Sequence, residues 1–492
     1  YKDPLLCVVQ KGRRTSKEPM SIEEMKNCQF VTQRESTDAD IQNFMKEKKI
    51  LPLVISMSLP MVVSMATNSL YNIVDSYFVA KISEDAMTAL SLVYPIQNLM
   101  TAIGVGFGVG LNAKIAYFLG AGASEQADKA ASTGMLLSLI HGIVLMVICL
   151  LGMPWFLSLY TKNQAILEMG LVYANRAFLF SVIIMLSISL EKIFQAVGKM
   201  RVSMISMIAG FVTNIVLDPL MIFGIGPFPR MGMAGAAYAT GIGQTVCLLC
   251  YFLFLYLDPV PLTFSKKYIS MDGGLLKGLY SIGIPATLNM ALPSLLISSL
   301  NGILSPFSDK YILVLGVYYK LQTFVYLTAN GIIQGIRPLV SFNYGAGEKK
   351  RVEQIYRTTL ALSAGVMAVG TGLSLCIPGQ MIGLFTAQKD TLQIGIKALQ
   401  IICIGFIPSA VSVTCCGVLE ALGKGVPSLL VSSLRYVAVM IPAAFIMSRI
   451  IGAEGVFVAF PITETVAAIA AFLIYRSFYT KSFQYNESSV QV

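Results

Sequence analysis

Two apolar segments of the sequence carry carboxylates at regularly spaced polar positions. Asn68, Asn72 and Asp75 stand at i, i+4 and i+7, so they share one face of a helix, and Asn214 and Asp218 are four residues apart in the second segment. An ionised carboxylate at a bilayer centre costs at least ~2.5–3.5 kcal/mol, so each one needs a role. Burial and mutual repulsion would favour a protonated carboxyl that can take up and release a proton.

Pro219 strengthens this interpretation, because it lacks an N–H and leaves a backbone carbonyl one turn earlier free for an ion or water. Asp218 lies about 27 Å along its segment from Met200, and Asp75 lies about 37 Å from Ile50, at 1.5 Å per residue. We therefore expect both carboxyls in the outer half of the membrane.

Asp75, Asn214 and Asp218 are the predicted ion-coupling residues, and the coupling ion is H⁺ or Na⁺. The only metal that we consider is Na⁺ at these three residues, because carboxylate, amide and carbonyl oxygens suit a hard cation. The alternative is that Asp75 merely ends its helix near the outer interface, while Asn214 and Asp218 hold helices together by hydrogen bonds.

A third polar pattern consists of Gln322, Tyr326 and Asn330 at four-residue spacing. A polar stripe that faced lipid would be costly, so we expect it to line a cavity that binds drug, or to pack against another helix. Arg435 and Glu464 each lie about ten residues inside an apolar segment, and we favour a structural ion pair over a role in transport.

Glu191 is a candidate drug-binding or relay residue, and Asn68 and Asn72 are assigned to the same group. Glu191 lies seven residues before a Gly198-Lys199 turn, hence about 10 Å from the cytoplasmic side. The alternative is an interfacial carboxylate paired with Lys192 or Lys199.

Composition places these residues in a membrane protein. The 492 residues are 55% hydrophobic and 13% charged, compared with about 45–50% and 25% in soluble domains. The net charge of +10 is spread over short loops, which argues against a nucleic-acid partner. One histidine and nine scattered cysteines argue against a metalloenzyme, and we expect no cofactor.

Twelve apolar segments are long enough to cross a bilayer. Their approximate ranges are 50–79, 89–118, 130–155, 165–191, 200–224, 234–257, 275–305, 311–337, 352–376, 386–419, 426–449 and 455–477. Basic residues accumulate in alternate loops, on the side that also carries Lys46, Lys48, Lys49, Arg476 and Lys481. The positive-inside rule makes that side cytoplasmic, so both termini are predicted inside the cell and the protein in the cell membrane.

The sequence also repeats itself at one offset. Gly345 follows Gly120 by 225 positions in matching Gly-Ala-Gly runs, and Pro285 follows Pro60 by the same 225. This indicates two homologous six-helix lobes with the same membrane orientation. The predicted divisions are an N-terminal tail 1–49, an N-lobe 50–257, a cytoplasmic linker 258–274, a C-lobe 275–477 and a C-terminal tail 478–492.

Three runs carry a resemblance to a known family. They are Gln334-Gly-Ile-Arg-Pro-Leu-Val-Ser-Phe-Asn-Tyr-Gly-Ala-Gly347, Asn214-Ile-Val-Leu-Asp-Pro219 and Gly232-Met-Ala-Gly-Ala-Ala-Tyr-Ala-Thr240. They are similar to motifs of the multidrug and toxic compound extrusion (MATE) family, in its prokaryotic drug-exporting branch. The resemblance implies an all-α fold of twelve membrane helices in two lobes around a central cavity. It also implies alternating access and export of amphipathic, often cationic, drugs in exchange for protons or sodium.

The sequence departs from the family pattern in two respects. An Arg is common before the Ala-x-Gly that ends the fourth helix, where this chain has Gln195, with Glu420 in the second half. Some branches carry coupling carboxylates on the seventh and tenth helices, but residues 275–305 and 391–419 contain no Asp or Glu. These departures favour coupling in the N-lobe.

Other functions fit the sequence less well. A flippase for a lipid-linked saccharide would favour more helices and a basic cavity, whereas the cavity groups here are amide and acidic. No HExxH helix or paired catalytic Asp motif supports an intramembrane enzyme, and duplication favours an alternating carrier over a receptor or channel. The partners that we expect are small-molecule drugs and membrane lipids, with the protein acting as a monomer.

Overall fold

A computed structural model describes residues 41, 43–386 and 388–489, with side chains through Tyr479. This part of the chain consists of helices joined by turns and loops. Twelve helical spans are long and apolar enough to cross a membrane, as the sequence predicted. In the first half they are α2 (Ile50–Ala80), α3 (Glu84–Gly120), α4 (Ser124–Tyr160), α5 to α6 (Gln164–Ala177 and Ser181–Ala196), α7 (Met200–Phe223) and α8 (Met233–Leu257).

The second half repeats this series. Its spans are α9 (Gly273–Leu304), α10 (Asp309–Gly345), α11 (Lys349–Cys376), α13 to α14 (Lys389–Ile402 and Phe406–Ala421), α15 to α16 (Gly425–Ser433 and Met440–Ile451) and α17 (Glu454–Ser489). Short helices complete the chain: η1 (Asn43–Glu47), η2 (Phe178–Phe180), η3 (Lys266–Tyr268), α12 (Pro378–Gly383), η4 (Cys403–Gly405) and η5 (Leu434–Ala438). Because α17 continues to Ser489, residues 478–489 extend a helix, where the sequence predicted a tail.

Equivalent glycines end equivalent helices in the two halves. Gly122 and Gly347 have φ of 70° and 74°, and Gly198 and Gly423 have φ of 82° and 75°. Beside each, an N–H bonds the carbonyl five residues earlier, as in the bond from Lys199 N to the Phe194 carbonyl at 2.9 Å. This is the Schellman motif. It places the residue after the helix in the left-handed conformation, which glycine adopts readily because it has no Cβ. The 225-residue repeat is therefore visible in backbone geometry.

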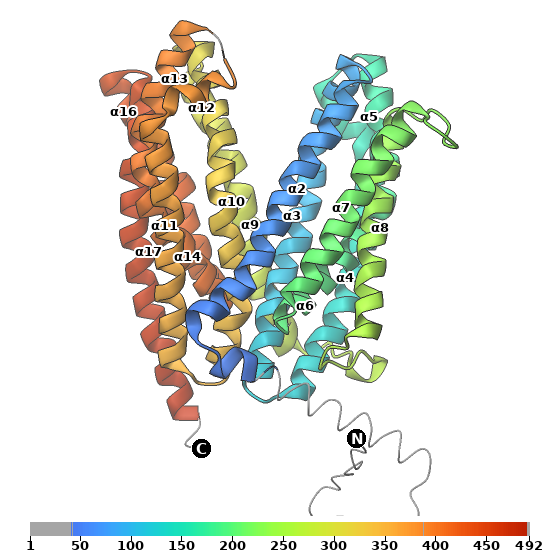
Figure 1. The fold of residues 1–492 in the computed structure, drawn as a ribbon, viewed down its shortest axis with the longest axis vertical. Coiled ribbons are helices and arrows are strands. Elements are labelled where there is room, and N and C mark those ends of the chain that lie inside the picture. Colours follow the sequence, from blue (N-terminus) through green and yellow to red (C-terminus); the bar gives the residue numbers. More distant parts are fainter. Residues whose placement is uncertain (1–40, 42, 387, 490–492) are drawn as a thin grey trace, which may run out of the picture.

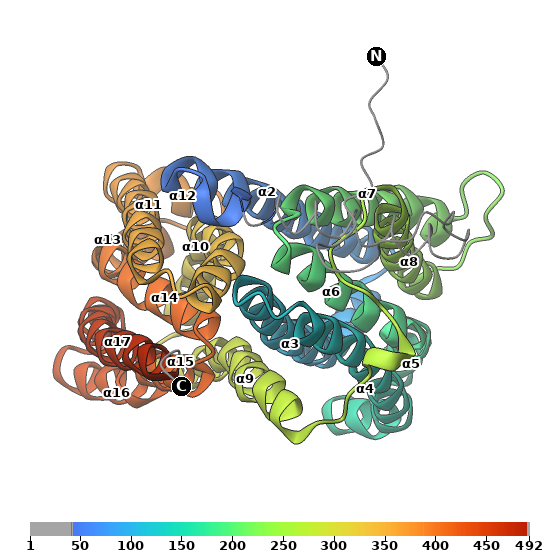
Figure 2. The same cartoon turned by 90° about the horizontal axis from the view of Figure 1, so that it is seen from below.

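The helices form two bundles that lie close together at the end near the termini and diverge toward the other end (Figure 1). The first helix of each half packs across the boundary: α2 lies against α10, and α9 lies against α3 (Figure 2). Small residues permit these contacts. A Cβ at Gly335 would lie 2.6 Å from the Ser58 Cα, and a Cβ at Gly106 would lie 2.8 Å from the Gly283 carbonyl oxygen.

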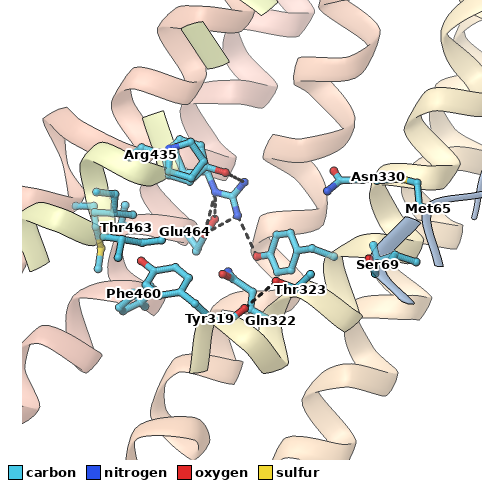
Figure 3. Close-up of a pocket in the computed structure, with 17 residues that line it drawn as sticks. Met65, Ser69, Tyr319, Gln322, Thr323, Asn330, Arg435, Phe460, Thr463 and Glu464 are labelled. Carbon is cyan, nitrogen blue, oxygen red and sulfur yellow. Dashed lines mark hydrogen bonds and ion pairs between the residues drawn. The ribbon is translucent and has the colours of Figure 1, made fainter. Parts of the chain in front are cut away.

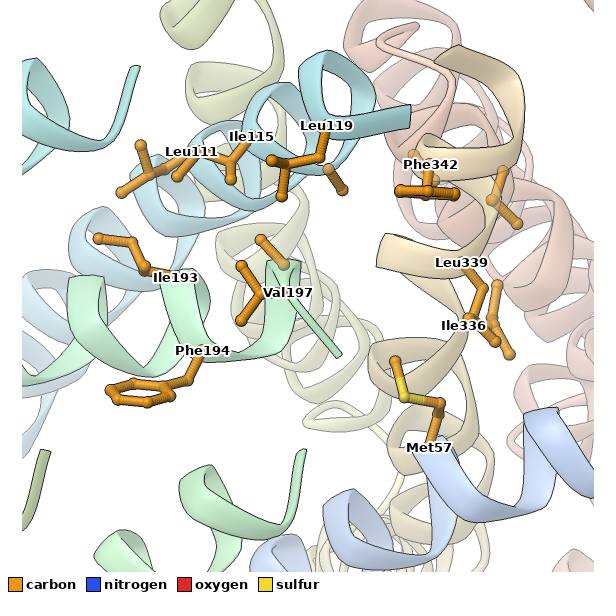
Figure 4. Packing of buried hydrophobic residues seen from close by; sticks show 14 of the residues in the cluster. Met57, Leu111, Ile115, Leu119, Ile193, Phe194, Val197, Ile336, Leu339 and Phe342 are labelled. Carbon is orange, nitrogen blue, oxygen red and sulfur yellow. The ribbon is translucent and has the colours of Figure 1, made fainter. Parts of the chain in front are cut away.

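The largest buried core joins the two bundles where they converge. Figure 4 shows side chains from α2, α3, α6 and α10 meeting there: Met57 of α2, Leu111, Ile115 and Leu119 of α3, Ile193 and Phe194 of α6 with Val197 directly after it, and Ile336, Leu339 and Phe342 of α10. Burial of this apolar surface keeps the bundles together at one end, while no equivalent cluster spans them at the other end within the described residues.

The residues directly before the first span are packed, although the sequence predicted that residues 1–49 form a tail. Met45 in η1 is fully buried, and its carbonyl accepts hydrogen bonds from Asn343 Nδ2 and Arg351 Nε, each at 3.2 Å. Hydrophobic burial of Met45 therefore orders this part of the segment. Residues 1–40 and 42 lie outside the described part of the chain.

Candidate functional site

The carboxyl groups of Asp75 and Asp218 lie in hydrogen-bond contact with each other. Asp75 comes from α2 and is 8% exposed, whereas Asp218 comes from α7 and is completely buried. Asn214, one turn before Asp218, donates from Nδ2 to Asp218 Oδ1 at 3.3 Å. The structure thus brings together the three residues that the sequence predicted for ion coupling.

This cluster has no basic partner within the described residues: neither carboxyl forms an ion pair with a lysine or arginine there. One oxygen of each carboxyl, Asp75 Oδ1 and Asp218 Oδ2, is buried and receives no hydrogen bond, and neither does Asn214 Oδ1. Two ionised carboxylates cannot donate to each other. A bound proton, or a cation shared by these oxygens, would satisfy them.

A second layer of hydroxyl and amide groups surrounds the cluster. Asn214 Nδ2 contacts Thr240 Oγ1 of α8 at 3.3 Å, and the same threonine hydrogen-bonds with Tyr71 and Tyr173. Gln97 Nε2 in turn donates to Tyr173 OH at 3.1 Å. The network therefore joins five helices. The sequence analysis assigned no role to these residues, although Tyr71 stands four residues before Asp75, a spacing that indicates the same helix face.

Close approach of α7 and α8 places Thr240 beside Asn214. Gly210 and Gly243 face each other, since a Cβ on either would lie 2.7 Å from the carbonyl oxygen of the other. Gly210 lies one turn before Asn214, and Gly243 lies three residues after Thr240. The paired glycines let the backbones meet, so the short threonine hydroxyl reaches the amide.

Asn68 and Asn72 are not part of this cluster. Both are exposed, and Asn72 Nδ2 donates to the Asn68 carbonyl at 2.8 Å and contacts Asn68 Oδ1 at 3.4 Å. They share a stripe with Asp75 in sequence, but Asp75 turns toward α7 and the two asparagines do not. Their assignment to drug binding remains a prediction.

Glu191 lies on α6 in a separate buried group. Lys192 Nζ and Gln195 Nε2 both donate to Glu191 Oε1 at 2.7 Å. A pairing of Glu191 with Lys192 was the alternative to a role in drug binding or proton relay. In the second half, Glu420 stands 225 residues after Gln195. It pairs with Arg337, with 2.6 Å between Oε2 and Nη2, and accepts from Asn289 Nδ2 at 3.0 Å.

A cavity of about 360 Å³ lies between α2 and the second bundle. Gln322, Tyr326 and Asn330 of α10 all line it, as the four-residue stripe predicted. Met65 and Ser69 of α2 face these residues across the cavity (Figure 3). The cavity is therefore bounded by helices from both halves of the chain.

The Arg435–Glu464 pair is also present, and it lies in the wall of the same cavity. Arg435 Nε is 2.8 Å from both carboxylate oxygens of Glu464, and Nη2 is 2.7 Å from Oε1. The ion pair predicted from the sequence is confirmed. The sequence did not predict that it would line a cavity.

The described residues contain no group of three or more His, Cys, Asp or Glu side chains that could hold a metal ion. Among the described residues, the candidate ligands for a cation at the carboxyl pair are two carboxylates and the amide oxygen of Asn214. Such an oxygen set suits Na⁺ rather than a transition metal.

Comparison with known proteins supports the family resemblance that the sequence motifs indicated. The MatE family model matches residues 60–220 and 285–446, two segments that together cover more than half of the chain. The multidrug export protein MepA of Staphylococcus haemolyticus is 26% identical over 434 residues, covering 88% of this chain and 95% of that protein. MepA of Staphylococcus aureus strain MSSA476 is also 26% identical, covering 88% and 94%.

Solved structures show the same fold. An outward-facing conformation of a multidrug resistance MATE family transporter of the MOP superfamily superposes with a TM-score of 0.83 at 23% identity. The match covers 90% of this chain and 98% of that chain. The twelve-helix architecture predicted from the sequence is therefore that of solved MATE transporters.

Proposed function

Since this chain belongs to the MatE family of membrane transporters, we propose that it exports amphipathic or cationic organic compounds by antiport with H⁺ or Na⁺. Members of this family are ion-coupled transporters, not enzymes. The MepA proteins of Staphylococcus that match 88% of this chain are multidrug export proteins.

The contact between Asp75 and Asp218 is the observation that carries the proposal. The two buried carboxyls have no basic partner among the described residues, and each keeps an oxygen without a donor. Unpaired buried charge is strongly disfavoured, so this arrangement favours the binding of an ion at the two carboxyls. Binding and release of that ion would supply the energy for export.

The two bundles provide the moving parts of alternating access. They share a core at the end near the termini and diverge at the other end. With both termini cytoplasmic, as loop charge predicts, this arrangement is open to the outside. We retain the division into an N-lobe 50–257 and a C-lobe 275–477 as the units that rock against each other.

Coupling requires only that each ligand favours a different state of the carrier. A cation at Asp75 and Asp218 would cancel their repulsion and stabilise the contact between α2 and α7. Because α2 also lines the cavity through Met65 and Ser69, ion binding at the carboxyls is linked to cavity shape through one helix. Drug and ion then need not touch.

A proton is the simpler coupling ion, because a carboxylic acid donates to a neighbouring carboxylate and accounts for their contact directly. Sodium is the second candidate. Asp75 Oδ1, Asp218 Oδ2 and Asn214 Oδ1 are all without a donor, and three oxygens with freed backbone carbonyls form a site for a hard cation.

The drug site that we propose is the cavity that Gln322, Tyr326 and Asn330 line, since amide and phenol groups there face aromatic and aliphatic walls. Glu191 remains a proposed drug-cation or relay residue. Its carboxylate is held by Lys192 and Gln195, so it could act only after those bonds rearrange.

Uptake of a fluorescent cation into proteoliposomes, with proton and sodium gradients imposed separately, tests the proposal. Stimulation by either gradient supports antiport and identifies the ion. Equal uptake with and without both gradients would reject ion-coupled export by this protein.

A further inference from the structure

Among the described residues that line the cavity, Arg435 and Glu464 are the charged ones, and they form a buried ion pair. Arg435 is 6% exposed and Glu464 is 7% exposed, and two guanidinium nitrogens contact the carboxylate at 2.7–2.8 Å. Because the opposite charges are equal and adjacent, the cavity wall carries no net charge from them.

Two tyrosines hold the guanidinium in place. Its centre lies 5.4 Å from the Tyr326 ring and 5.1 Å from the Tyr436 ring, within cation–π range. Arg435 Nη2 donates to Tyr326 OH at 3.0 Å and Nη1 donates to Tyr436 OH at 3.3 Å. With these bonds and those to Glu464, all three guanidinium nitrogens of Arg435 already have a partner inside the protein.

Two other hydroxyl groups of residues that line the cavity lack partners. Tyr319 OH and Thr463 Oγ1 are buried and form no hydrogen bond. Both residues line the cavity, on the same side as Glu464 (Figure 3). A buried hydroxyl without a partner is costly, so these groups favour a ligand that supplies a hydrogen bond.

We propose that this cavity is a substrate subsite for the uncharged aromatic part of the drug, and that the Arg435–Glu464 pair sets its charge specificity. The inference rests on the proposed export function and deepens it. Rings of Tyr319 and Phe460 pack on the aromatic body, and the Tyr319 and Thr463 hydroxyls bond its polar substituents.

The ion pair therefore keeps the wall of the cavity without net charge. Removal of Arg435 leaves a carboxylate that attracts cations and repels anions, and removal of Glu464 leaves a guanidinium with the opposite effect. At separations of about 5–6 Å and an effective dielectric constant of about 20, one unpaired charge changes affinity by about tenfold or more.

Two fluorescent probes of the same length test this specificity. Both carry a dansyl ring on an ethyl linker, and one ends in trimethylammonium while the other ends in sulfonate. Dissociation constants are measured by dansyl fluorescence with protein in nanodiscs and no ion gradient, after subtraction of empty nanodiscs. The wild-type ratio of cation to anion affinity is the reference.

Relative to that reference, Arg435→Gln should shift the ratio about a hundredfold toward the cation, because the cation binds about tenfold more tightly and the anion about tenfold more weakly. Glu464→Gln should shift the ratio about a hundredfold toward the anion for the opposite reason. The double variant Arg435→Gln/Glu464→Gln has no unpaired charge and should return to within about threefold of the wild-type ratio. If both single variants leave the ratio unchanged, or shift it in the same direction, the pair does not set charge specificity.

Tyr319→Phe provides a test that leaves the ion pair intact. Loss of one hydroxyl should weaken both probes about threefold to tenfold without changing their ratio. Unaltered affinity for both probes would show that they do not bind in this cavity. Binding is measured without a gradient, so these outcomes do not depend on ion coupling. If the ratios shift as expected but the protein transports no drug, the export proposal is rejected and the proposal for the cavity stands.

Discussion

Asp75 and Asp218 are 143 positions apart in the sequence, yet their carboxyl groups meet between α2 and α7 without a basic residue to neutralise them in the described part of the chain. The contact places the predicted ion site on α2, the helix that also crosses to α10 and lines the cavity. A change at the carboxyls can therefore reach the other half of the molecule through one helix, α2.

Asp218→Asn should reduce gradient-driven drug export to background while the protein remains folded. Asparagine keeps the size and the hydrogen bonds of aspartate but cannot exchange a proton. Export of a fluorescent cation from proteoliposomes at several pH values is the measurement.

The matched control is Asp390→Asn, the same substitution at an exposed residue paired with Lys310 on the surface. It should export at the wild-type rate, because a surface ion pair contributes little. Wild-type export by the Asp218 variant across the pH range would show that this carboxyl is not required.

Thr240→Val should weaken both stability and coupling. The change keeps the side-chain shape but removes the hydroxyl that Asn214 and the two tyrosines contact. Leaving those buried groups unsatisfied costs about 1–3 kcal/mol. A lower thermal unfolding midpoint together with a reduced response of transport to the ion gradient is expected; no change in either would remove Thr240 from the network.

Gly106→Ala should destabilise the contact between the two bundles. The added Cβ would lie 2.1 Å from Thr287 Oγ1 and 2.7 Å from the Thr287 amide nitrogen. Backbone must shift to admit it, at a cost of about 1–3 kcal/mol.

Gly302→Ala, in the last turn of α9, has no atom within 4 Å of the added Cβ and serves as control. Thermal unfolding in detergent should show a lower midpoint for the first variant only. Equal midpoints would mean that α3 and α9 do not depend on this close approach.

Single cysteines in a cysteine-free background test the membrane orientation. Positions 199 and 349 should react with an impermeant thiol reagent only from the inside, and positions 162 and 389 only from the outside. The opposite labelling pattern would reverse the topology and the direction in which the bundles open.

Most of the fold could be predicted because its signals are local. Each span is one long apolar run, and the turns that end α3 and α6 recur 225 residues later around glycines with positive φ. Met45 escaped prediction, because a single apolar side chain in a charged segment carries no periodic signal. Its burial depends on Asn343 and Arg351, which lie far along the chain.

The candidate site could be predicted only in part. Asp75, Asn214 and Asp218 stood out because charge and amide groups are expensive in apolar segments. Thr240 and Tyr173 did not, since isolated hydroxyl groups are common in membrane helices and their meeting depends on how α5 and α8 pack. Asn68 and Asn72 were predicted to share a face with Asp75 because of their helical spacing. In the structure Asp75 is buried and the two asparagines are exposed.

Ion movement driven by drug is the most direct test of coupling at Asp75 and Asp218. Proteoliposomes loaded with a drug gradient, without an imposed ion gradient, are monitored for internal pH and for radioactive sodium. The wild-type protein should move H⁺ or Na⁺ against the drug, and the Asp75→Asn/Asp218→Asn variant should move neither ion. Drug-driven ion movement that persists in the double variant would place the coupling site elsewhere and contradict the account.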